Sequence, residues 1–139
     1  MVPSEPPIPG TVLRYSYLWH RRAEAGREEG DKDRPVALVI ARADRDCVVV
    51  PITHTPPADP ASAVPLSGSE RARLGLDEEQ CWIVTTEINV FTWPGPDLRP
   101  IPRKKPNTVV YGLLSKGTFS NVLRQLQARA RLLRIVRRE

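Results

Sequence analysis

The sequence predicts a mainly β protein, folded as a small, tightly curled barrel with a few helices. Fifteen prolines among 139 residues argue against a helical bundle, because proline interrupts helix interiors and central strands. Residues 36–41 and 47–53 are nearly continuous apolar runs on either side of the turn signal "ADRD". Runs of this kind predict strands that are buried on both faces, as in a barrel rather than an open sheet.

The length of the chain predicts a single domain over residues 1–139, and its 40% hydrophobic content suffices for a modest core. The proline-rich start, residues 1–9, is expected to be flexible and lacks the basic and apolar regions of a signal peptide. No apolar run approaches the roughly 20 residues that a membrane-spanning helix requires. We therefore expect a cytoplasmic protein with no membrane partner.

The first third of the chain predicts one strand followed by a loop. Residues 12–19 are β-rich and follow the Pro9–Gly10 punctuation, which predicts the first strand. Residues 20–33 hold four basic and five acidic side chains without apolar periodicity. This composition predicts a solvated, mobile loop that is long enough to act as a lid. The hairpin over residues 36–53 comes next.

Beyond the hairpin the sequence predicts two helices and two strands. The segment "SERARLG" predicts one or two helical turns, with Ser69 as the N-cap and Gly75 as the stop. Strands are expected at residues 81–91 and 108–114. From Ser115, another N-cap candidate, apolar residues recur at helical spacing to about Arg134. Residues 115–139 carry seven basic side chains against one acidic, so the other face of this helix is strongly basic.

The net charge bears on the partner of the protein, and the cysteines bear on metal binding and disulfides. The net charge of +5 is consistent with a polyanionic partner. The only cysteines, Cys47 and Cys81, have neither the spacing of metal ligands nor that of a disulfide framework. We expect both to be reduced thiols buried in strands, and we expect no metal site and no cofactor.

The open end of the hairpin gathers three polar side chains. If the turn is centred between residues 44 and 45, the numbers of paired residues sum to 89. Arg34 then opposes Thr55, and Val36 opposes Thr53. Arg34, Thr53 and Thr55 would share one face of the sheet, with directly opposed Cβ atoms about 5 Å apart. Pro35 favours an extended conformation at Arg34.

Such a cluster has the chemistry to hold a phosphodiester. A guanidinium offers two donors to phosphate oxygens, and a threonine hydroxyl offers another. Donors of this kind stabilise a transition state in which charge accumulates on the phosphate oxygens. A structural alternative remains open, in which Arg34 pairs with Asp33 or Asp31 and the threonines bond to nearby backbone groups.

The ordered segments of the chain resemble the MazF/PemK (Kid) family of toxin–antitoxin mRNA interferases. These segments are "IPGTVLRYSY", a charged loop, "DRPVALVIA", "VVVPITHT", "LGLDEEQCWIVTTEINVF" and "YGLLSKGTFSNVLRQL". The resemblance covers most of the chain and implies a small SH3-like β-barrel of the CcdB/Kid/MazF type with a C-terminal helix. It also implies a homodimer, a cognate antitoxin, and metal-independent cleavage of single-stranded RNA by attack of the ribose 2′-hydroxyl.

The resemblance assigns roles to individual residues. Arg34 and Thr53 match the catalytic arginine and threonine of the family. Some relatives carry an arginine and an aspartate in the strand that here contains Asn89 and Thr92, which puts mechanisms that need this second pair in doubt. Possible proton carriers are His54, His20 and Glu87, although strand alternation points His54 away from Thr53. The expected substrate-binding residues are Thr55, Asn89, Trp93 and Arg99.

Several aromatic side chains have the chemistry to stack on RNA bases. Trp19, Trp82, Trp93 and Phe91 are candidates for stacking on RNA bases, with Trp93 the best placed and Trp82 better suited to the core. The favoured function is an endoribonuclease toxin. The alternative is a catalytically impaired barrel that binds nucleic acid, or that binds a protein as gyrase-directed toxins do.

Overall fold

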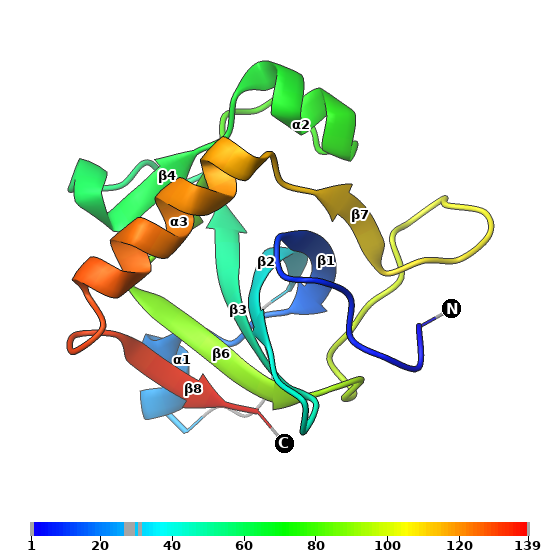
Figure 1. The fold of residues 1–139 in the computed structure, drawn as a ribbon, viewed down its shortest axis with the longest axis horizontal. Coiled ribbons are helices and arrows are strands. Elements are labelled where there is room, and N and C mark those ends of the chain that lie inside the picture. The colour runs from blue at the N-terminus through cyan, green and yellow to red at the C-terminus, as the bar shows by residue number, and fades with distance from the viewer. Residues whose placement is uncertain (1, 27–29, 31, 139) are drawn as a thin grey trace.

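A curled sheet dominates the structure. The computed structural model describes residues 2–26, 30 and 32–138, and in this part of the chain eight strands form the sheet (Figure 1). The strands are β1 (Thr11–Ser16), β2 (Asp33–Ala41), β3 (Asp46–Thr53), β4 (Ala63–Pro65), β5 (Trp82–Val84), β6 (Glu87–Thr92), β7 (Val110–Leu113) and β8 (Arg134–Arg137). Their order is β4-β5-β3-β2-β1-β7, with β6 paired to β3 and β8 to β6. The prediction of a mainly β fold is confirmed.

Strands β1, β2 and β3 are buried on both faces, as their continuous apolar runs predict. Val12 and Ala37 face a core that helix α3 (Lys116–Ala128) completes through Val122. The next residues along the strands, such as Leu13, face a second core. This second core is rich in aromatic side chains: Tyr15, Tyr17, Phe91 and Trp93. Alternation along each strand thus divides the apolar residues between two cores.

The register of the β2–β3 hairpin differs by two residues from the expected one. Val36 pairs with Pro51 rather than with Thr53. Because side chains alternate with a period of two, this shift leaves residues 36–38 on their expected face, whereas beyond the bulge, at Ile40 and Ala41, the register differs by one. If the observed register is continued by two residues, Arg34 lies directly opposite Thr53. The expected register placed Arg34 opposite Thr55, so Arg34 and Thr53 are closer than expected.

A bulge and an odd-numbered turn account for the corrected register. The pairing shifts between Leu38 and Ile40, where one strand carries an extra residue. At the turn, the N–H of Arg42 donates to the carbonyl of Asp46, and Arg45 adopts a left-handed φ of 72°. The expected register assumed an even turn without a bulge, and the sequence carries no glycine to mark either irregularity.

The outer edge of β3 changes partner halfway along its length. Residues 46–49 pair with β6, whereas Ile52 and Thr53 pair with β5. Pro51 lies between the two segments and offers no N–H to extend either ladder. The single strand expected at residues 81–91 is therefore two strands, separated at Thr85 and Thr86. This fork in the sheet creates the space that becomes the candidate site.

Serine side chains cap the N-termini of helices α2 (Gly68–Leu74) and α3, and a 3-10 helix, η1 (Pro60–Ser62), precedes β4. Helix α2 begins at Ser67, whose hydroxyl accepts from a backbone N–H, and not at the expected Ser69. It ends at Gly75, which has a left-handed φ of 71° as predicted. Ser115 caps α3 as predicted. A short helix, α1 (His20–Glu24), occupies the start of the expected loop at residues 20–33, of which residues 27–29 and 31 lie outside the described residues.

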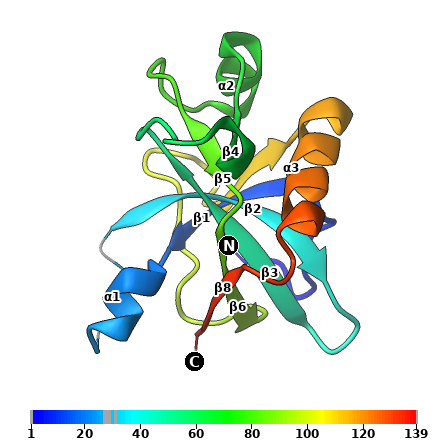
Figure 2. The ribbon, with the colours of Figure 1, turned by 90° about the vertical axis from the view of Figure 1, so that its left-hand side faces the viewer.

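The C-terminal helix is shorter than expected, and a strand follows it. Helix α3 ends at Ala128, and β8 pairs in parallel with β6 (Figure 1). Ile135 and Val136 are β-branched, which suits a strand, and Val136 is buried. The predicted basic helix face is therefore divided between a helix and an edge strand. Figure 2 shows α1 and α3 on opposite sides of the sheet.

The N-terminal residues, expected to be flexible, have specific contacts with the sheet. The indole N–H of Trp93 donates to the carbonyl of Pro3 over 2.9 Å. Arg45 donates to the carbonyl of Ser4 and forms a 3.0 Å ion pair with Glu5. Among the described residues, no helix is long and apolar enough to cross a membrane.

Arg138 anchors the C-terminal end of the chain. It is 6% exposed and donates to the carbonyl of Ser16 and to Oδ1 of Asn89. It also forms a 3.0 Å ion pair with Asp97, and its guanidinium carbon lies 5.6 Å from the centre of the Tyr15 ring. These contacts tie β8 to β1 and β6, so a charged side chain is held within the fold by several partners at once.

Replacing Arg138 by alanine should lower the free energy of unfolding by about 3 to 5 kcal/mol, because Asp97 would stay behind without its buried partner. Urea unfolding measures this change. Arg137→Ala is the matched control, since the Arg137–Asp46 pair lies at the surface and should contribute little. Equal losses in the two variants would contradict a special role for Arg138.

Both cysteines are free and buried, as predicted. Burial raises the pKa of Cys47 and of Cys81 to about 11, so little thiolate forms at pH 8. A thiol reagent at pH 8 should label neither residue in the folded protein and both after denaturation, as mass spectrometry can measure. Rapid labelling of the native protein would contradict this burial.

Candidate functional site

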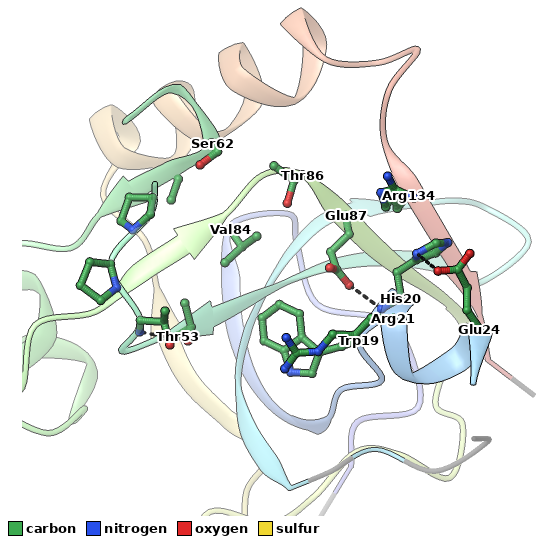
Figure 3. Close-up of a pocket in the computed structure, with 14 residues that line it drawn as sticks. Trp19, His20, Arg21, Glu24, Thr53, Ser62, Val84, Thr86, Glu87 and Arg134 are labelled. Carbon is green, nitrogen blue, oxygen red and sulfur yellow. Dashed lines mark hydrogen bonds and ion pairs between the residues drawn. The ribbon is translucent and has the colours of Figure 1, made fainter. Parts of the chain in front are cut away.

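An open cleft of about 520 Å³ lies at the fork of β3 (Figure 3). Thr53 reaches it from the end of β3, Val84 from the end of β5, and Glu87 from the start of β6. One wall is formed by α1 and the residue before it. The opposite wall is formed by residues 55–57 and 62–63. The cleft therefore exists because the sheet divides at this point.

Strand β6 holds the start of the α1 wall in place through Asn89. The carboxamide of Asn89 accepts from the N–H of Leu18 over 3.0 Å and donates to its carbonyl over 2.8 Å. Asn89 is fully buried and Leu18 is 3% exposed, so both backbone groups depend on this side chain. The chain turns directly after Leu18, and this turn brings Trp19 and α1 to the cleft.

Glu87 supports the same wall from inside the cleft. Its Oε1 accepts from the backbone N–H of His20 over 2.9 Å and from the hydroxyl of Tyr17 over 3.1 Å. Burial, reinforced by the Glu87 carboxylate, raises the pKa of Tyr17 well above its ordinary value. The Tyr17 hydroxyl therefore stays protonated and acts as a donor, so one oxygen of Glu87 receives two hydrogen bonds.

Thr53 lines the cleft, whereas Arg34 lies beside it and is not among the residues that line it. Nη1 of Arg34 lies 3.5 Å from the carbonyl oxygen of Ile52, the residue before Thr53. The guanidinium carbon of Arg34 lies 5.1 Å from the centre of the Trp19 ring, and Trp19 lines the cleft. This geometry is a cation–π contact, which holds the guanidinium beside the cleft.

One contact of the structural alternative, in which the threonines bond to nearby backbone groups, is present. The hydroxyl of Thr53 accepts from the N–H of Thr55 over 3.2 Å, a local turn contact. The hydroxyl proton of Thr53 is still available to donate, because the hydroxyl acts only as an acceptor in this bond. Asp33 pairs with Arg99 at 3.5 Å.

Charged groups of both signs border the cleft. Arg21 and Arg134 are exposed and line it, and the backbone N–H of Arg134 donates to the carbonyl of Thr86. Glu24 also lines the cleft and lies 3.5 Å from Nδ1 of His20. Figure 3 shows His20, Glu24 and Arg134 on the side of the cleft opposite Thr53. The cleft thus has cationic edges, with the Glu87 carboxylate between its walls.

His54 lies away from the cleft, as strand alternation predicts. Its Nδ1 lies 3.0 Å from the carbonyl oxygen of Gln80, and its Nε2 lies 3.2 Å from Oδ2 of Asp77. It is not among the residues that line the cleft. The structure therefore gives no support to His54 as a proton carrier. Of the other two candidates, His20 and Glu87 both line the cleft.

Three of the four expected substrate-binding residues lie elsewhere, and only Thr55 lines the cleft. Asn89 is 0% exposed and Trp93 is 2% exposed, so neither side chain can contact a substrate in this structure. Trp93 instead packs against Phe91. Arg99 pairs with Asp33 and bonds to backbone carbonyls of its own loop. The expected substrate-binding roles of Asn89 and Trp93 are corrected to structural ones, and that of Arg99, which lies outside the cleft, stays a prediction.

Sequence reasoning missed Arg134, Arg21 and Thr86. Arg134 was assigned to a helix, and only its place in β8 brings it beside Thr86. The β-branched pair after Arg134 was the available signal for a strand there. Arg21 was assigned to a loop, although Trp19 and His20 beside it were recognised as candidates. Thr86 carries no signal at all in the sequence, because the fork in the sheet selects it.

Comparisons with known proteins do not identify a family. No protein-family model matches the chain, and no curated protein has a significantly similar sequence. Within the described residues, no cluster of three or more His, Cys, Asp or Glu side chains is arranged to hold a metal ion.

Replacing Asn89 by alanine should destabilise the α1 wall, because the N–H and C=O of Leu18 would lose their buried partner. Each lost partner costs about 1 to 3 kcal/mol. Hydrogen exchange should accelerate over residues 18–25, as measured by mass spectrometry. Asn121→Ala is the control, since Asn121 is exposed on α3 and its side chain accepts a hydrogen bond from Arg124. Unchanged exchange in Asn89→Ala would contradict this role.

Proposed function

We propose that the protein is a sequence-specific, metal-independent endoribonuclease of the MazF/PemK type that cleaves single-stranded RNA. The observation that carries this proposal is the position of the Arg34 guanidinium, which contacts Trp19 and the carbonyl of Ile52 beside the Thr53 that lines the cleft. The positive charges of Arg21 and Arg134 at the edges of the cleft support it, because they favour a polyanionic strand. The open cleft has room for a nucleotide from an unpaired strand.

The reaction needs a phosphate held beside its own ribose. The 2′-hydroxyl attacks phosphorus, a bond from O2′ to phosphorus forms, and the bond from phosphorus to O5′ breaks. The products are a 2′,3′-cyclic phosphate and a 5′-hydroxyl end. Arg34 and Thr53 donate hydrogen bonds to the nonbridging oxygens, where negative charge increases in the transition state. No cofactor takes part in the proposed reaction.

Two proton transfers accompany these bond changes, one from the 2′-hydroxyl and one to O5′. His20 is the best-placed carrier, because it lines the cleft and its Nδ1 lies near Glu24. Histidine is the side chain that most often acts as a general acid and base in enzymes. Some members of the resembled family carry a second charged pair, an arginine and an aspartate, where this chain has Asn89 and Thr92. Asn89 is buried, and Thr92 bonds to Asp46. We assign the electrostatic role of that pair to Arg21 and Arg134.

The remaining parts of the proposal follow the family resemblance. The curled sheet with its C-terminal helix α3 is compatible with an SH3-like barrel of the CcdB/Kid/MazF type. We propose a cytoplasmic growth inhibitor that acts as a homodimer and is neutralised by a cognate antitoxin protein. An acidic antitoxin segment would be attracted by the basic edges of the cleft.

A second function is favoured by the missing charged pair. Without it, the barrel would bind single-stranded nucleic acid, or a protein such as gyrase, without cutting RNA. The cleft favours nucleic acid over protein, because its edges carry arginines suited to phosphates. Cleavage and binding assays on one RNA separate the two functions.

The proposed function predicts that the purified protein cuts a mixed single-stranded RNA in EDTA and leaves 2′,3′-cyclic phosphate ends. Arg34→Ala should lower the cleavage rate about 10²- to 10³-fold, because it removes a donor to the transition state. Gel electrophoresis and end-group analysis measure both results. Thr53→Val should also slow cleavage, since it keeps the shape of the side chain and removes the hydroxyl.

Arg42→Ala is the matched control, because Arg42 lies on the same hairpin, where its side chain is 67% exposed and pairs with Asp44. It should cut as fast as the wild type. Cleavage that is equal in wild type and Arg34→Ala would exclude the proposed site. Binding of RNA without any cleavage by the wild type would favour the second function.

A further inference from the structure

The two oxygens of the Glu87 carboxylate have different surroundings. Oε1 receives hydrogen bonds from the His20 N–H and the Tyr17 hydroxyl. In the described part of the chain, no donor reaches Oε2. Glu87 lines the cleft, and Figure 3 shows its carboxylate above Trp19, between Val84 and His20. The cleft therefore contains a hydrogen-bond acceptor whose orientation the protein has already set.

A carboxylate at this position interacts differently with the phosphate and with the base of a nucleotide. It repels a phosphate, so the phosphate belongs at the arginine-bearing edges and beside Thr53. It accepts hydrogen bonds from N–H groups of a neutral base. The indole of Trp19 provides an aromatic surface next to it, and aromatic side chains commonly stack on unpaired bases. The region around Glu87 and Trp19 thus has the chemistry of a base-binding site.

We propose that Glu87 selects a base with an exocyclic amino group, namely cytosine, adenine or guanine, and rejects uracil. This inference rests on the proposed function only in that single-stranded RNA enters the cleft. An exocyclic amino group points an N–H outward, where a carboxylate oxygen can accept it. Uracil offers one N–H flanked by two carbonyl oxygens, which a carboxylate repels. Glu87 is therefore a specificity residue and not a proton carrier.

The Glu87→Gln variant replaces the hydrogen-bond acceptor at the position of Oε2 by a donor and keeps the shape of the side chain. The backbone N–H of His20 can only donate, so it keeps the amide oxygen of the glutamine at the position of Oε1. The amide NH₂ then takes the position of Oε2 and presents a donor where the wild type presents an acceptor. A donor there suits the O4 carbonyl of uracil and repels an amino group. The variant should therefore prefer uracil.

Two RNA pools test this inference. A random natural RNA pool is cut in EDTA, and sequencing of the ends gives the base preference at each position around the cut. A random 2′-fluoro RNA pool, which lacks the nucleophile and cannot be cut, is selected for binding and sequenced. At one position the wild type should prefer an amino base over uracil on the order of tenfold. Glu87→Gln should remove or invert that preference.

Glu79→Gln is the matched control, because it neutralises an exposed carboxylate that does not line the cleft. It should keep the preference of the wild type. A test on the wild type alone avoids any dependence on the folding of the variants. In a selected 2′-fluoro oligonucleotide, cytosine is replaced by uracil, or a purine by hypoxanthine, which removes the amino group. Affinity should fall about tenfold at that position only.

The outcomes separate this inference from the proposed function. Cleavage with a base preference that Glu87→Gln leaves unchanged overturns the role of Glu87 and leaves the nuclease intact. An inverted binding preference without cleavage by the wild type supports the role of Glu87 and overturns the nuclease. The absence of both binding and cleavage overturns both.

Discussion

The buried carboxamide of Asn89 is the contact on which the candidate site depends. It bonds to both backbone groups of Leu18, at the point where the chain leaves the barrel to form α1. Its oxygen also accepts from Arg138, whose guanidinium reaches β1 and Asp97. One strand, β6, therefore fixes both the C-terminal strand and the wall of the cleft.

The cleft contains both positive and negative side chains, which lie in different parts of it. Arginine side chains at its edges attract a polyanion, while Glu87 between the walls repels phosphate and attracts N–H donors. Tyr17 and the start of α1 hold Glu87 by the same oxygen, so its position is set before any substrate arrives. Such preorganisation favours selectivity, because little ordering remains to be done on binding.

Local chemistry made much of the fold predictable. The apolar runs of β2 and β3 flank a turn signal and are buried, and serine and glycine caps act within a few residues of their helices. The register of the hairpin was missed because a bulge between Leu38 and Ile40 leaves no mark in composition. The end of α3 was missed because helical spacing continued past Ala128, while the edge of β6 recruited the next residues as a strand.

By itself, the sequence determined the β class, the hairpin, and the shared face of Arg34 and Thr53, because strand alternation is a local property with a period of two. The tertiary structure alone decided where the sheet divides, and hence that Thr86, Glu87 and Arg134 border one cleft. It also decided that Asn89 and Trp93 are buried. These outcomes depend on pairing between strands that are distant in sequence, which no local pattern of residues records.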